Sequence, residues 1–204
     1  EKVAADRMEN PRDDFMSVLA HLKYDGEPAS LHEVTANIFH MIEGALGNSR
    51  NGIAMGVWLL MSNPDQAQIL REDPSLIPSA VDEVLRWSSN SPTRLRIANK
   101  DTELGGKEIT YGDWVVGFLK SANHDERVFP NPEKFDVTRR PKHLALGTGV
   151  HNCLGRHLFR LELSLLFKRL LEDFELEFKG EPQWGSNAPG SKLLSSFTVG
   201  FKRR

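Results

Sequence analysis

The feature that most constrains this chain is its only cysteine, Cys153, which stands in a glycine-rich run just before a strongly helical segment. The run extends from Leu146 to Gly155 and includes Gly147 and Gly149. A thiol at a helix N-terminus lies where unpaired amides and the helix dipole stabilise negative charge on the sulfur. The glycines allow a tight backbone that aims N–H groups at the sulfur and leaves room for a large, flat partner. A thiolate ligand of haem iron requires these surroundings.

This run resembles the haem-binding loop of the cytochrome P-450 family of haem-thiolate monooxygenases, which combines glycines, a basic residue, the ligating cysteine and a further glycine. The residues that match this loop are Gly147, Gly149, His151, Cys153 and Gly155. The resemblance implies haem b with Cys153 as the axial iron ligand, His151 bonded to a haem propionate, and Arg96 paired with a propionate from a short strand. The alternative, a structural cysteine buried at a helix start, accounts for Cys153 and for none of its neighbours.

Glu83 and Arg86 stand one helical turn apart and resemble the ExxR motif of this family. By spacing alone, such a pair is typical of an ion pair on a solvated helix face. The resemblance implies that the pair secures the network around the cysteine loop, together with a basic residue from a PERF-type segment. That position holds Lys134 where arginine is usual, and lysine lacks the forked bidentate geometry. Arg139 and Arg140 are the alternative partners.

A nearly uncharged stretch predicts a long helix. Ser30 and Glu33 have the spacing of a capping box at its start, and Asn63, ahead of a proline, marks its end. Apolar side chains spread around most of the circumference, which is typical of a helix buried on most sides. Three glycines each weaken the helix interior by roughly 1 kcal/mol relative to alanine, so something bulky is expected to approach closely there. These glycines are Gly44, Gly47 and Gly52.

In the family this helix crosses the haem face opposite the cysteine and carries an acid followed by threonine, which help to deliver protons to dioxygen. Counting back from Asn63, the two positions fall on Gly47 and Asn48, so the usual pair is absent. Asn48 can donate to and accept from an oxygen species or a water, but it cannot titrate. Glu43, one turn earlier on roughly the same face, could replace the acid or could pair with a basic residue across a packing interface.

Further patterns complete the expected fold. Alternating residues from Thr93 to Leu119 predict short strands around a glycine turn, and a long irregular stretch leads to a last helix from about Leu154 to Asp173. We therefore expect a mainly α (α+β) architecture with a small side sheet, with haem held between the glycine-bearing helix and the last helix. By resemblance, Ser91 to Leu95 and Leu193 to Ser196 line a substrate pocket of unspecified chemistry.

Composition excludes several classes of protein. The 204 residues include 39% apolar and 26% charged residues, typical of a globular core. With 26 basic and 28 acidic residues, the net charge of −2 lacks the cationic excess of a nucleic-acid-binding protein. A single cysteine excludes an internal disulfide or a zinc site of several thiolates. With no signal peptide and no apolar run long enough to cross a bilayer, we expect no membrane association and a cytoplasmic location.

Basic residues recur along the last helix and could form a docking face for an acidic electron donor such as a ferredoxin. The alternative is the ordinary solvated side of a helix. The residues concerned are Arg156, His157, Arg160 and Lys168.

The resemblance accounts only for the C-terminal half of a family member, so we expect residues 1–204 to be the C-terminal portion of a haem-thiolate monooxygenase domain whose N-terminal portion is absent. The leading hypothesis is hydroxylation of a small organic substrate with dioxygen and two electrons from a redox partner. One alternative is a haem-thiolate enzyme that uses peroxide or rearranges its substrate, because the acid and alcohol are missing. The other is a truncated, non-catalytic fragment, with or without haem.

Overall fold

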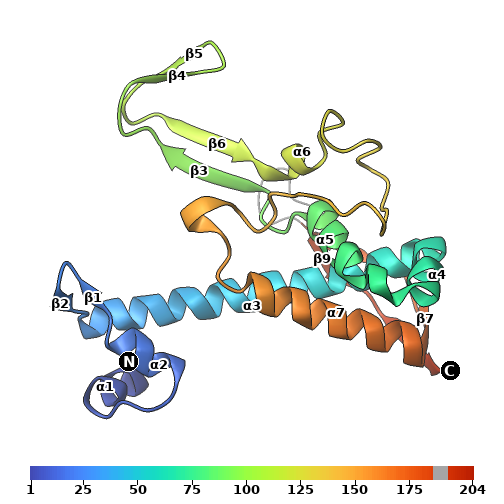
Figure 1. The fold of residues 1–204 in the computed structure, drawn as a ribbon, viewed down its shortest axis with the longest axis horizontal. Coiled ribbons are helices and arrows are strands. Elements are labelled where there is room, and N and C mark those ends of the chain that lie inside the picture. Colours follow the sequence, from blue (N-terminus) through green and yellow to red (C-terminus); the bar gives the residue numbers. More distant parts are fainter. Residues whose placement is uncertain (186–192) are drawn as a thin grey trace. The chain divides into compact units, whose positions relative to one another are not determined.

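The computed structural model describes residues 1–185 and 193–204 (Figure 1). The chain divides into two compact units, Glu1–Asn48 and Ser49–Arg204. The long helix α3 (Leu31–Ser62) runs through the boundary, so each unit contains part of it.

The first unit is a small helical cluster with one hairpin. Its elements besides α3 are α1 (Lys2–Glu9), α2 (Phe15–Ala20), β1 (Lys23–Tyr24) and β2 (Glu27–Pro28). The predicted capping box is confirmed at the start of α3. The Ser30 N–H donates to Glu33 Oε2 at 2.8 Å, and the Glu33 N–H donates to Ser30 Oγ at 3.3 Å. These bonds satisfy two amides that the first turn leaves without helical partners.

The second unit holds the remaining helices and strands. Its helical elements are the rest of α3, α4 (Pro64–Glu72), the 3-10 turn η1 (Pro74–Leu76), α5 (Ile77–Ser88), α6 (Leu119–Asn123), the 3-10 turn η2 (Gly149–His151) and α7 (Arg156–Asp173). Its strands form antiparallel pairs: β3 (Thr93–Ile97) with β6 (Trp114–Phe118), β4 (Thr102–Leu104) with β5 (Lys107–Ile109), β7 (Phe174–Phe178) with β10 (Val199–Arg203), and β8 (Gln183–Gly185) with β9 (Leu193–Ser196). The described strands therefore form separate two-stranded ladders rather than one side sheet.

The core of the second unit lies where α5 and α7 pack with the C-terminal part of α3 (Figure 1). Gly52 was expected to admit a bulky group, and the ring of Phe159 from α7 occupies that space. Gly56 leaves room for the ring of Phe167 in the same way, because a Cβ on Gly56 would lie 2.6 Å from Phe167 Cζ. The close approach predicted at Gly52 is confirmed, and the approaching group there is an aromatic side chain of α7.

Within the first unit, the first half of the long helix is not buried on most sides, contrary to the prediction. One stripe of α3, beginning at Val34, packs on the small core of the first unit. The opposite stripe is exposed at Phe39, Ile42 and Leu46, with exposed fractions of 71%, 54% and 69%. A Cβ on Gly44 or Gly47 would meet no described atom within 4 Å, so nothing bulky approaches there within the described residues. The elements of this unit are too few to surround a helix.

In the part of the chain that the structure describes, no helix is both long enough and apolar enough to span a bilayer.

Candidate functional site

Glu83 and Arg86 form a buried ion pair at the centre of the second unit. Both side chains are completely buried, and Arg86 donates to Glu83 through Nε at 2.7 Å and through Nη2 at 2.9 Å. A helix with apolar residues on the surrounding face places them there, since Val84 and Leu85 are also buried. The pair is therefore part of the core and differs from an ordinary i,i+3 pair on a solvated face.

The second cation beside Glu83 is Arg139. Its Nε donates to Glu83 Oε1 at 3.1 Å, and its Nη1 donates to the Pro130 carbonyl at 2.7 Å. The role assigned to Lys134 falls to Arg139, because the Lys134 side chain is exposed and its carbonyl oxygen instead accepts from Arg139 Nη2 at 3.0 Å. The forked guanidinium reaches a carboxylate and several carbonyl groups at once, which an ammonium group does not do.

The same pair also organises the irregular stretch after α6. Arg86 donates to the carbonyl groups of Asn123 at 2.7 Å and Pro132 at 2.8 Å, and Glu83 accepts from the Asp136 N–H at 3.1 Å. Asn123, fully buried, extends this network by accepting from the Leu144 N–H at 2.8 Å. A long segment without helix or strand is thus held by charged and amide side chains.

The cysteine loop is closed by its own backbone. The Cys153 N–H donates to the Leu146 carbonyl at 2.8 Å, and Asn152 Nδ2 donates to the Gly147 carbonyl at 3.1 Å. Gly147 has a φ of +71°, and a Cβ there would lie 2.8 Å from the His151 carbonyl oxygen. Glycine is required at this position, because any side chain would collide with the returning backbone.

The far side of this loop is open. Cys153 is exposed, and a Cβ on Gly149 or Gly155 would meet no described atom within 4 Å. Helix α7 begins at Arg156 with Gly155 as its N-cap, two residues later than predicted, so Cys153 precedes the first turn. Three apolar side chains are exposed on the loop and the first turn of α7, with exposed fractions of 98%, 73% and 62%. They are Val150, Leu154 and Leu158.

These features fit a porphyrin bound through the sulfur. The donor is one accessible thiol, the neighbouring glycines leave space beside it, and the exposed apolar side chains match the apolar face of a macrocycle. The backbone amide of Cys153 is already bonded to Leu146, so it is not free to donate to the sulfur.

The other predicted haem contacts are solvent-facing. His151 ends the short turn η2 and is exposed. Arg96 is exposed on β3, opposite Val115 of β6, and its Nη1 donates to the Leu95 carbonyl at 2.8 Å. Both side chains therefore have room for an anionic partner, and their pairing with haem propionates stays a prediction.

The proposed proton-delivery residues belong to the first unit. Glu43 is exposed and lies 3.9 Å from His40 Nδ1 on the same helix, measured to Glu43 Oε2. Asn48 is exposed, and its Nδ2 donates to the Gly44 carbonyl at 3.5 Å. This contact of Glu43 is with a residue of its own helix. The alternative, a pair with a basic residue across a packing interface, is not seen within the first unit. The relation of both residues to the cysteine loop stays a prediction.

Sequence reasoning missed a second charged cluster, beside the buried pair. Asp82 Oδ1 accepts from His143 Nε2 at 3.3 Å and from Arg160 Nε at 2.8 Å. Partial burial raises the pKa of Asp82, but the hydrogen bonds from His143 and Arg160 outweigh it and lower the pKa overall. The only sign of this cluster in the sequence was that Asp82 directly precedes Glu83. Arg160, expected on a free docking face, is partly engaged here.

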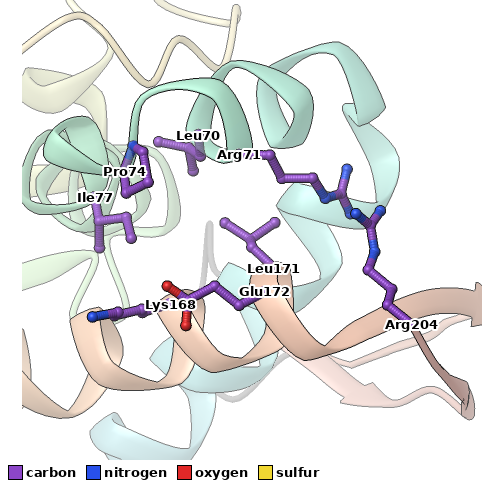
Figure 2. Close-up of a pocket in the computed structure, with 8 residues that line it drawn as sticks. All are labelled: Leu70, Arg71, Pro74, Ile77, Lys168, Leu171, Glu172 and Arg204. Carbon is purple, nitrogen blue, oxygen red and sulfur yellow. The ribbon is translucent and has the colours of Figure 1, made fainter.

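A cavity of about 180 Å³ lies at the other end of α7. Figure 2 shows the residues that line it. Arg71 and Arg204 point toward each other there, and burial lowers the pKa of Arg71, with the charge of Arg204 lowering it further. Lys168 in its wall is twelve residues beyond Arg156, about 18 Å along the helix at 1.5 Å per residue. This cavity is therefore separate from the cysteine loop.

Comparison with known proteins identifies the class to which this fold and this loop belong. The family model described as Cytochrome P450 matches residues 1–196. The chain belongs to the cytochrome P450 family, and its mainly helical fold is the fold of that family.

Individual relatives support the assignment. The chain is 44% identical over 178 residues to putative cytochrome P450 126 of Mycobacterium tuberculosis H37Rv, covering 85% of this chain and 43% of the relative. It is 42% identical over 168 residues to a steroid C26-monooxygenase of the same strain, covering 82% and 42%. The crystal structure of CYP108D1 from Novosphingobium aromaticivorans superposes with a TM-score of 0.88 at 36% identity, covering 100% of this chain and 50% of that one. The chain thus spans about half the length of these relatives.

Proposed function

We propose that residues 1–204 are the C-terminal portion of a haem-thiolate monooxygenase in which Cys153 ligates haem b iron. The observation that carries this proposal is the exposed thiol on a glycine loop that is closed on one side and open on the other. Haem bound through a thiolate supplies the activation of dioxygen, using two electrons from outside. The substrate is a small organic molecule, and the steroid monooxygenase among the relatives favours an apolar one.

The residues of this chain bind and orient the group. The hydrogen bond from the Cys153 N–H to Leu146 fixes the direction of the cysteine backbone. Exposed apolar side chains around the loop, such as Leu154, exclude water from the sulfur once they are covered. His151 and Arg96 each bring a basic group to a haem propionate in this proposal.

Leu146 departs from the aromatic residue that the family resemblance places beside the sulfur. Leu146 is half-buried, and its carbonyl accepts from the Cys153 N–H. A smaller side chain alters solvent access around the thiolate, and therefore the reduction potential more than the ability to bind iron.

Proton delivery rests on Asn48 and Glu43 in this proposal. The Asn48 amide would orient a water, and the Glu43 carboxyl group would pass on a proton. Glu43→Gln removes a titratable proton with little change of shape. Turnover and uncoupling equal to those of the parent protein would reject the catalytic role of Glu43.

An acidic ferredoxin-type donor is the proposed source of electrons. Arg156, His157 and Lys168 carry basic groups on α7. Arg156 Nη1 also donates to the Cys153 carbonyl at 3.2 Å, and Arg160 is partly engaged with Asp82. Arg156→Glu should slow electron transfer from a ferredoxin and steepen its loss with salt, because rim charges act mainly on association. An unchanged rate at low salt would reject this face as the docking surface.

Peroxide use or rearrangement is the second candidate, favoured by Gly47 and Asn48 at the positions of the missing acid and alcohol. Peroxide-driven turnover equal to that with a ferredoxin system would favour it. A non-catalytic fragment is the remaining alternative.

One spectrum tests the central proposal. The longest natural protein that carries residues 1–204 is reduced and exposed to carbon monoxide, and the band characteristic of a thiolate-bound haem is expected. Cys153→Ala should abolish that band. Its persistence in the variant would overturn the assignment of Cys153, and absence of haem from the parent protein would favour the non-catalytic fragment.

A further inference from the structure

A single carboxylate oxygen joins the segments on either side of the cysteine loop. Asp82 Oδ1 on α5 accepts from His143, ten residues before Cys153, and from Arg160, seven residues after it. The bonds measure 3.3 Å and 2.8 Å. Side chains from both flanks of the loop therefore meet at one atom on a neighbouring helix, in addition to the bond from the Leu144 N–H to Asn123.

The position of Asp82 is fixed because its neighbour in sequence, Glu83, is held in the core. Successive helical side chains point about 100° apart, so Glu83 faces the core while Asp82 faces the loop and α7. Glu83 is fully buried between Arg86 and Arg139. The turn of α5 that carries Asp82 is thus fixed independently of the cysteine loop.

The contacts continue from Asp82 to the cysteine itself. The His143 side chain is 3% exposed, and its Nδ1 accepts from the Ala145 N–H at 3.1 Å. With Nδ1 accepting, the proton of the neutral ring is on Nε2, which donates to Asp82. Ala145 precedes Leu146, whose carbonyl accepts from the Cys153 N–H. His143 therefore transmits the position of Asp82 to the backbone that orients Cys153.

We infer that Asp82 is a positioning residue, which holds the cysteine loop through His143 and Arg160 and thereby sets the orientation of the Cys153 sulfur. The inference rests on the proposed function, because it treats this sulfur as the ligand of haem iron. Asp82 contacts His143 and Arg160 rather than the sulfur, so its effect is indirect and belongs to the outer network that tunes a bound metal.

Hydrogen exchange tests whether Asp82 holds the cysteine loop. It is measured on the haem-free protein, in the longest natural form that carries residues 1–204. Asp82→Ala should speed exchange of the Cys153 amide by about tenfold relative to the parent protein, the effect of losing charged hydrogen bonds. The Val84 amide inside α5 should be unchanged, which separates local loosening from general instability. Asp82→Asn keeps an acceptor oxygen for His143 and should restore most of the protection.

A matched pair of arginine variants on α7 controls for loss of charge. Arg160→Ala removes the bond to Asp82 and should loosen the Cys153 amide. Arg169→Ala removes an exposed arginine that pairs with Asp173 at 3.7 Å and should leave that amide protected. If Asp82→Ala does not fold, this pair decides the question alone. Equal exchange in Arg160→Ala and Arg169→Ala would overturn the inference.

The reduction potential of the haem-loaded protein is the second measurement. Asp82→Ala should shift the potential and lower the thiolate-ligated fraction of the carbon monoxide complex, with Asp82→Asn in between. A potential equal to that of Arg169→Ala would overturn the link to the sulfur. If the parent protein binds no haem, the proposed function fails, while hydrogen exchange still tests whether Asp82 holds the loop.

Discussion

Arg139 donates through Nε to Oε1 of Glu83 at 3.1 Å, although 56 positions of sequence separate the two residues. Glu83 is completely buried and also pairs with Arg86, so one carboxylate neutralises part of the charge of two guanidinium groups. The irregular stretch between α6 and the cysteine loop depends on this arrangement.

Arg139→Ala should lower the free energy of unfolding by about 2–4 kcal/mol, because a largely buried charged partner of Glu83 is lost. Lys134→Ala should change it by less than about 0.5 kcal/mol, since that side chain is exposed. Urea unfolding of both variants measures the difference. Equal losses would contradict the assignment of the contact to Arg139.

Glu83→Gln should be more damaging than either change. It leaves the guanidinium of Arg86, fully buried, without an anion, and the expected loss is about 3–5 kcal/mol. The variant should therefore unfold at a lower denaturant concentration than the parent protein, and circular dichroism measures the midpoint of the transition. A parent-like midpoint would mean that the carbonyl groups around Arg86 suffice to hold its charge.

Gly56→Ala should destabilise the protein by about 1–3 kcal/mol, because the new Cβ would lie 2.6 Å from Phe167 Cζ in a packed core. Gly44→Ala, on the same helix with no described atom within 4 Å, should stabilise it by up to about 1 kcal/mol. Thermal unfolding compares the two. Phe167→Leu should partly relieve the Gly56→Ala clash. If it restores no stability, the destabilisation by Gly56→Ala does not come from the contact with Phe167.

The stability of the first unit should depend on the ionisation of Asp14. The hydrogen bond from Arg7 and the backbone hydrogen bond from Ser17 lower the pKa of Asp14 from 3.8 to about 2. Because the folded-state pKa is the lower one, the contribution is complete above about pH 5 and is lost as the pH falls to about 2. NMR titration of the carboxyl group measures the pKa. In Asp14→Asn, this part of the acid sensitivity should vanish.

Residues close together in sequence determined the local structure by themselves. The capping box of Ser30 and Glu33 formed as predicted, because its partners are three residues apart and need no other element. The cysteine loop was recognisable for the same reason, since Gly147 has to accommodate a backbone that returns within a few residues. The family could be inferred from that loop alone.

Tertiary structure alone decided which distant side chains meet. The sequence placed Lys134 at the expected position and left Arg139 and Arg140 as alternatives, and only the path of the chain after α6 brings Arg139 to the buried carboxylate of Glu83. Asp82 acquired its partners His143 and Arg160 in the same way. Local preference extends over one or two turns of chain, whereas burial of charge depends on every element that packs around it.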